Sequence, residues 1–191
     1  MILAASVPIG LLLGTIFGGD VDRLTRLRLR WPWLAVAGLA FQVLLFTAAG
    51  ASLAGGLAPT LYVASTAIVL VAVLRNIRLT GMPIVAVGSV SNLLAIVANG
   101  GAMPADPAAL ATAGLDGAGA YTNSVVLANP ALRPLTDIFA IPAGIPLANV
   151  FSVGDVLIAL GIVVVIVAAM RRPADRPATD GPAAAPATGS R

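Results

Sequence analysis

The chain alternates between long uncharged apolar runs and short segments that carry its charges. Each run is close to the length that a helix needs to cross a bilayer, since about 20 apolar residues span the hydrocarbon core. We therefore predict an all-α integral membrane protein, a bundle of about five transmembrane helices. The predicted spans cover residues 1–18, 34–50, 57–74, 82–98 and 153–170.

The positions of the arginines predict how these spans are oriented. Positively charged residues accumulate in short cytoplasmic loops. Arginines follow the first, third and fifth runs, none follows the second, and the long segment 99–152 holds only Arg133. We expect a protein of the plasma membrane with its N-terminus outside and its C-terminus in the cytoplasm. No basic residue precedes the first run, which we interpret as a retained helix and not as a signal peptide.

Composition supports a membrane protein and excludes several kinds of chemistry. Only 10% of residues are charged, whereas a soluble domain has about a quarter. Without His or Cys the chain has no thiol nucleophile, imidazole base, haem ligand or ordinary zinc site, so we expect no cofactor and no metal. The pI near 10.6 does not indicate a nucleic-acid partner, because the basic residues flank apolar runs.

We predict a single transmembrane domain over residues 1–172. Its one large part outside the membrane is an external cap, residues 99–152, between the fourth and fifth spans. Connections this long are commonly functional. The Ala- and Pro-rich residues 173–191 cannot bury a core and are expected to form a disordered cytoplasmic tail.

The many prolines of the cap limit helices there to short pieces. We expect such pieces near 108–113 and 134–139, and a short strand within 121–127, where Val, Thr and Tyr favour extended structure. The apolar residues 138–151 are expected to lie near the membrane surface.

The stretch Phe151 to Asp155 places a carboxylate at the start of the last predicted span. One interpretation is structural, with Ser152 as N-cap and Asp155 closing a capping box. The other is functional, because an ionisable group at membrane depth is costly and usually faces a cavity or a partner. If Asp137 lies near Asp155, the two carboxylates can share a proton and hydrolyse a peptide bond. Asp137 also has a structural alternative, a local ion pair with Arg133 four residues earlier.

Asn99, Gly100 and Gly101 end the fourth span and have two interpretations as well. Structurally they form a helix C-cap with a flexible exit. Functionally, the Asn99 amide and the glycine N–H groups, with Ser152, would bind a substrate near its carbonyl oxygen.

Several polar residues inside the spans are predicted to bond between helices, since unpaired polar groups are costly in lipid. Asn92 is expected to face Ser89, Ser91 or another helix. The others are Gln42, Ser65 and Thr66.

Phe151 to Asp155 and the apolar run after it resemble the second aspartate motif of lipoprotein signal peptidase, signal peptidase II, which reads Phe-Asn-x-Ala-Asp. The last four spans also resemble that enzyme's four helices in orientation. The resemblance implies a membrane aspartyl peptidase with Asp155 and Asp137 as catalytic carboxylates. Here Ser152 replaces the Asn of the motif and Gly154 its Ala, and Asp137 lacks the flanking Asn and Arg of the family's first motif.

Most of residues 1–172 resembles an uncharacterised family of bacterial multi-pass membrane proteins, a domain of unknown function. The stretches that carry this resemblance are Asn99 to Pro104, Leu135 to Asp137 and Ser152 to Asp155.

Two kinds of function remain open. The first is an aspartyl-type hydrolase that cleaves a membrane-tethered peptide at an external site. The second is a non-enzymatic scaffold or accessory subunit that binds a partner membrane protein through its external segment. A transporter fits less well, because no span carries a charge near its middle.

Overall fold

The structure is a computed structural model that describes residues 2–115 and 124–171. The predicted tail 173–191 lies outside the described residues. The described chain is mostly helical, and its five longest helices coincide closely with the five predicted spans. They are α1 (Ile2–Ile16), α2 (Pro32–Leu45), α4 (Ala58–Arg75), α5 (Met82–Ala98) and α7 (Val153–Arg171).

The second predicted span, 34–50, is wrong at its end, because α2 stops at Leu45. Thr47 then begins the short helix α3 (Ala48–Ala54), and its hydroxyl accepts a hydrogen bond from the Gly50 N–H at 3.0 Å. A methyl group at Gly50 would collide with the Leu44 carbonyl, so the chain can turn this tightly only at glycine. A 3-10 turn, η2 (Gly55–Leu57), joins α3 to α4.

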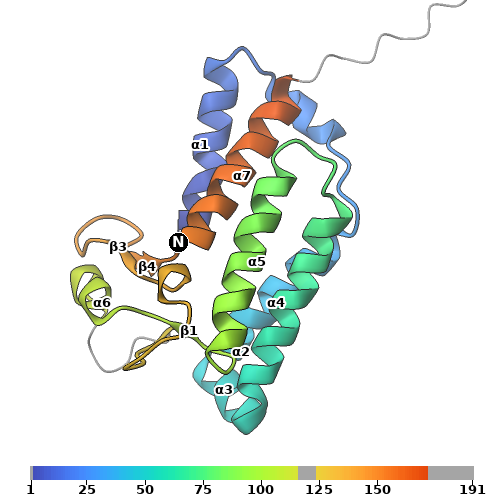
Figure 1. The fold of residues 1–191 in the computed structure, drawn as a ribbon. Helices are drawn as coiled ribbons and strands as arrows, with labels where there is room; N and C mark the ends of the chain where they lie inside the picture. The colour runs from blue at the N-terminus through green and yellow to red at the C-terminus, as the bar shows by residue number, and fades with distance from the viewer. Residues whose placement is uncertain (1, 116–123, 172–191) are drawn as a thin grey trace, which may run out of the picture.

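The long helices form a row in the spatial order α1, α7, α5, α4, α2 (Figure 1). The central helix, α5, packs against α7 on one side and against α4 on the other, while α1 packs on α7 and α2 packs on α4. Consecutive helices α1 and α2 therefore lie at opposite ends of the row. The 3-10 helix η1 (Val21–Arg26) connects them and packs against α7.

Glycines bring α5 and α7 into close backbone contact. A methyl group at Gly88 of α5 would lie 2.5 Å from the carbonyl oxygen of Gly154 in α7, and one at Gly81 would lie 2.6 Å from that of Gly161. Gly88 lies seven residues after Gly81, the N-cap of α5, and Gly161 lies seven residues after Gly154 in α7, a spacing of two helical turns that returns to the same face. The two helices therefore meet along one seam of small residues.

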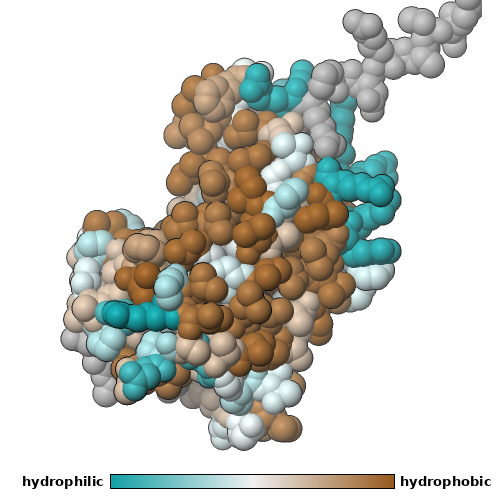
Figure 2. All heavy atoms as spheres, viewed as in Figure 1, coloured by the Kyte–Doolittle hydropathy of each residue, from teal (hydrophilic) through white to brown (hydrophobic). Residues whose placement is uncertain are grey.

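The helices expose many large apolar side chains, and apolar residues cover most of the bundle face that Figure 2 shows. Two stretches, Ala48–Arg75 and Val153–Arg171, are long and apolar enough to cross a membrane, and α1, α2 and α5 are shorter apolar helices. The arginines of the described chain, apart from Arg133, lie at one end of the bundle, where α1, α4 and α7 end and α2 and α5 begin.

That end of the bundle is held together by side chains of the α4 C-terminus. The Asn76 amide donates to the Arg30 carbonyl and accepts from the Arg30 N–H, both at 2.8 Å. The Arg75 guanidinium lies 4.5 Å above the ring centroid of Trp31, which precedes α2. These contacts fix the connection that leads from η1 to α2.

The described part of the cap, residues 99–115 and 124–152, lies at the other end of the bundle, beside the start of α7 (Figure 1). Its helix α6 (Pro107–Ala113) agrees with the helical piece predicted near 108–113. The helical piece predicted at 134–139 is wrong, because a shorter 3-10 turn, η3 (Arg133–Leu135), is followed there by strand β3 (Phe139–Ile141). The strand predicted within 121–127 is found at 124–125, and residues 121–123 lie outside the described residues. The elements are β1 (Met103–Pro104), α6 (Pro107–Ala113), β2 (Ser124–Val125), η3 (Arg133–Leu135), β3 (Phe139–Ile141) and β4 (Asn149–Phe151).

Two small sheets hold the cap together. Strands β1 and β2 pair in parallel, with Met103 opposite Ser124. Strands β3 and β4 pair antiparallel, with Phe139 opposite Phe151. No pattern in the sequence predicts this hairpin.

Candidate functional site

A cavity of about 260 Å³ lies where the cap meets the helix bundle. Residues of α1 and α2, the two ends of the helix row, both line it, so the row curls around this space. Its polar lining comes from the helices and from the cap, and comprises Gln42, Tyr62, Thr66, Ser89, Asn92, Asp137, Asn149 and Asp155.

Asp155 lies at the start of α7 and is held by a closed set of hydrogen bonds. One carboxylate oxygen accepts from the Asn92 amide at 2.7 Å, and the other accepts from the Ser152 N–H at 3.2 Å. The Ser152 hydroxyl accepts from the Asp155 N–H at 3.0 Å and donates to the Asn92 amide oxygen at 2.8 Å. The capping box predicted from the sequence is therefore confirmed. Asn92 extends it from α7 to α5, which confirms that this residue faces another helix.

Gly154 makes room for this arrangement. A methyl group at residue 154 would overlap the Asn92 amide oxygen and would also approach the Gly88 carbonyl. An alanine at this position would force Asn92 away from Asp155.

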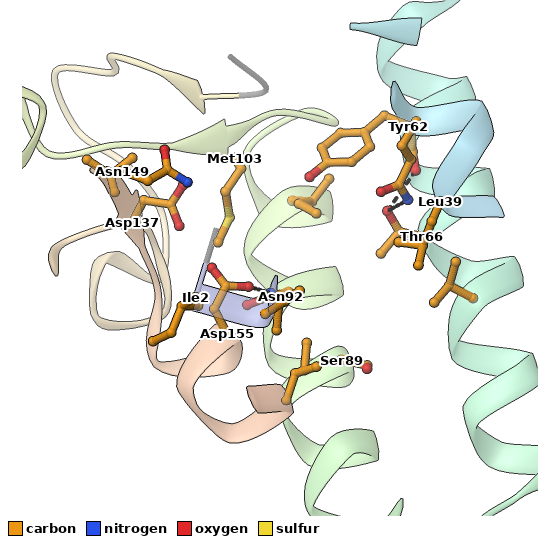
Figure 3. Close-up of a pocket in the computed structure, with 16 residues that line it drawn as sticks. Ile2, Leu39, Tyr62, Thr66, Ser89, Asn92, Met103, Asp137, Asn149 and Asp155 are labelled. Atoms are coloured by element: carbon orange, nitrogen blue, oxygen red, sulfur yellow. Dashed lines mark hydrogen bonds between the residues drawn. The ribbon is translucent and has the colours of Figure 1, made fainter. Parts of the chain in front are cut away.

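Asp137 belongs to the cap and is held through its backbone. Its N–H donates to the Pro104 carbonyl and its carbonyl accepts from the Asp106 N–H, both at 2.9 Å. The residue is 5% exposed, and its side chain lines the same cavity as Asp155. Figure 3 shows the two carboxyl groups directed into one space beside Met103.

Arg133, the residue considered as a local partner for Asp137, is engaged elsewhere. Its guanidinium donates to the Asp106 carboxylate at 2.9 Å. This hydrogen bond, with a further one from the Ala108 N–H, lowers the pKa of Asp106 below its usual value. The pair lies on the cap surface, outside the cavity lining.

Asn99, Gly100 and Gly101 do not line the cavity. The Asn99 amide donates to the Ala95 and Ala131 carbonyls at 2.7 and 2.9 Å and accepts from the Ala131 N–H at 2.8 Å. Gly100 and Gly101 have φ values of 71° and 87°, and Gly101 packs against Pro59. The helix C-cap interpretation of this stretch is therefore confirmed.

The cavity wall opposite the aspartates is made by α2 and α4. The Gln42 amide donates to the Ser65 and Thr66 hydroxyls, both at 3.2 Å, which confirms the predicted interhelical bonding. Tyr62 and Asn149 also line the cavity, and neither was predicted from the sequence. Tyr62 could have been recognised as a candidate, because it places a phenol within an apolar run. Asn149 could not, because its strand was not predicted.

The residues described here include no cluster of His, Cys, Asp or Glu side chains suited to a metal ion. Within the described chain, the chemistry of the cavity is therefore that of two carboxyl groups, amides and hydroxyls. A carboxyl pair of this kind can accept and donate protons.

The fold and the cavity define a mainly helical protein in which two helical stretches are long and apolar enough to cross a membrane. The chain belongs to the family of unknown function DUF5317, which it matches over residues 26–167. That range contains both Asp137 and Asp155, and it confirms the predicted membership of an uncharacterised family. No curated protein and no solved structure matched the chain, so the resemblance to signal peptidase II stays a prediction.

Proposed function

We propose that the protein is a multi-pass plasma-membrane protein that hydrolyses a membrane-tethered peptide at the outer face of the bilayer. The observation that carries this proposal is the shared cavity, which is lined by Asp155 of α7 and by Asp137 of the cap. The two carboxyl groups come from different elements, and each is set in place by its own hydrogen bonds, of the side chain for Asp155 and of the backbone for Asp137. Such preorganisation is what an acid–base pair needs.

The proposed reaction follows from the chemistry of two carboxyl groups. One carboxylate removes a proton from water while the water oxygen attacks the carbonyl carbon of the peptide bond. The other, in its protonated form, donates a proton to the leaving nitrogen as the C–N bond breaks. The products are a new carboxylic acid, which then gives its proton to the new amine, and one proton transfer between the two aspartates restores the site.

The location at the outer face is supported by where the charges lie. The arginines at one end of the bundle favour a cytoplasmic position for that end, which puts the cap and the cavity outside. In this proposal α1, α2, α4, α5 and α7 all cross the bilayer. The shorter helices are accommodated by a locally thinner membrane.

The test of the hydrolase compares membranes from cells that contain the protein with membranes from cells that lack it. Mass spectrometry measures the new peptide termini that cleavage produces. Asp155→Asn and Asp137→Asn should each reduce the new termini by at least about 100-fold. Asp106→Asn is the matched control, because this carboxylate lies outside the cavity and Asn also serves as an N-cap. Wild-type cleavage by both cavity variants, at unchanged membrane abundance, would overturn the proposal.

A second candidate is the non-enzymatic scaffold, which two observations favour. Both oxygens of Asp155 already bond within the protein, so this residue has a structural task. The cap also exposes Val126 (55%) and Leu132 (47%), which a partner membrane protein could cover. A scaffold predicts that Val126→Asp and Leu132→Asp abolish co-purification of a partner, and that Asp137→Asn leaves it unchanged.

A further inference from the structure

The β3–β4 hairpin, residues 139–151, is placed by its direct connection to α7. Only Ser152 separates the end of β4 from the start of α7, and Ser152 is fully buried. The hairpin therefore cannot move far from the N-terminal end of that helix. Figure 1 shows its connecting loop projecting from the cap on the side of α1 and α7.

The hairpin exposes apolar side chains and carries no charge. Phe139, Ile145 and Leu147 are 43%, 52% and 42% exposed. No residue from 138 to 154 is ionisable. This surface therefore offers water no charged group to solvate and leaves apolar side chains exposed to water, which is unfavourable.

The loop between the strands is also rigidly presented. Gly144 has a φ of 89°, and the Ala148 N–H donates to the Ile145 carbonyl at 3.1 Å, which closes a turn around the tip. The Ala143 N–H donates to the Thr112 carbonyl of α6 at 2.9 Å, which ties the tip to the body of the cap. The exposed side chains of Ile145 and Leu147 are therefore already held outward, so binding through them costs little further conformational entropy.

We propose that the tip of the hairpin inserts into the lipid headgroup region beside the start of α7 and anchors the cap to the membrane. This inference rests on the proposed function in one respect, that α7 spans the bilayer. The apolar surface of the hairpin then continues that of α7, where Val153 and Val156 are exposed. Uncharged apolar residues of this kind bury themselves at the boundary between headgroups and acyl chains.

The anchor would act directly on the cavity. Asn149 and Val150 of β4 line it, and the other strand of the hairpin begins two residues after Asp137. A hairpin held at the bilayer surface therefore keeps one wall of the cavity at the depth where a membrane-tethered substrate presents its peptide.

The test uses single-tryptophan proteins in lipid vesicles, with both native tryptophans changed in the background Trp31→Phe, Trp33→Phe. Ile145→Trp reports on the hairpin, and Val126→Trp, at a site of similar exposure elsewhere on the cap, is the matched control. Leu160→Trp, on the exposed face of α7, reports on membrane insertion of that helix. The probes are phosphatidylcholine vesicles whose acyl chains are brominated near the headgroup or near the chain end.

For Ile145→Trp we expect quenching by lipids brominated near the headgroup to exceed that of Val126→Trp by at least about twofold. Leu160→Trp should be quenched more by lipids brominated near the chain end. Quenching of Leu160→Trp, with Ile145→Trp no more quenched than the control, would overturn the hairpin anchor and leave the spanning helix intact. If Leu160→Trp also escapes quenching, the membrane-spanning arrangement fails together with the anchor.

Discussion

Asn92 joins helix α5 to the start of helix α7 at the candidate site. Its amide lies within α5, accepts from the hydroxyl of Ser152, the residue before α7, and donates to Asp155 in the first turn of α7. The sequence predicts that the Asn92 amide bonds to a partner, and the structure confirms this. It could not predict which partner, because Asn92 and Asp155 are 63 residues apart in the chain.

Replacing Asn92 by Ala should therefore destabilise the protein. The change leaves one oxygen of Asp155 and the Ser152 hydroxyl without their partner, a loss of about 1–2 kcal/mol for hydrogen bonds of this kind. Thermal unfolding of the purified protein in detergent measures the effect. Asn129→Ala, at an exposed position of the cap, is the matched control. Equal unfolding temperatures for the two variants would show that the Asn92 network contributes nothing to stability.

At the scale of elements, the seam of glycines decides how α5 and α7 meet. Ala has a better helix propensity than Gly by about 1 kcal/mol, so Gly88→Ala would stabilise an isolated α5. In the bundle the new methyl group would lie 2.5 Å from the Gly154 carbonyl oxygen and 2.9 Å from Ile158 Cγ1. Backbone cannot move aside as a flexible side chain can. The overpacking term, about 1–3 kcal/mol, therefore exceeds the gain in propensity.

We expect Gly88→Ala to unfold at a lower temperature or denaturant concentration than the wild type. Gly56→Ala is the control, because a methyl group there meets open space. Equilibrium unfolding followed by circular dichroism compares the two variants. A Gly88→Ala protein as stable as the wild type would mean that α5 and α7 separate more readily than this packing implies.

The helices were predictable from the sequence because each apolar run ends at a charged, polar or Gly/Pro signal. Where that signal is missing, the prediction failed. Residues 45–48 read Leu-Phe-Thr-Ala within an apolar run, and only the capping bond of Thr47 shows that a new helix begins. The β3–β4 hairpin was missed for a similar reason, since residues 138–151 lack the alternation of apolar and polar positions that marks a strand.

For the whole molecule, the spatial order of the helices differs from their order in the chain. Helix α7 lies between α1 and α5, so the last helix of the described chain packs against the first. Hydrophobic periodicity cannot reveal such an order, because nearly every face of these helices is apolar. The position of these arginines at one end of the bundle was predictable. It follows from the alternation of arginine-rich and arginine-poor connections along the chain, which does not depend on which helices touch.

The orientation of the bundle is the prediction that belongs to the whole molecule. The chain contains no cysteine, so a single introduced thiol gives a signal without background. Asn129→Cys, exposed on the cap, should react with a membrane-impermeant maleimide in intact cells. Thr80→Cys, exposed in the turn between α4 and α5, should react only after the cells are opened. The reverse pattern would place the arginines outside, against the preference of positive charge for the cytoplasmic side, and would move the aspartate cavity to the cytoplasmic face.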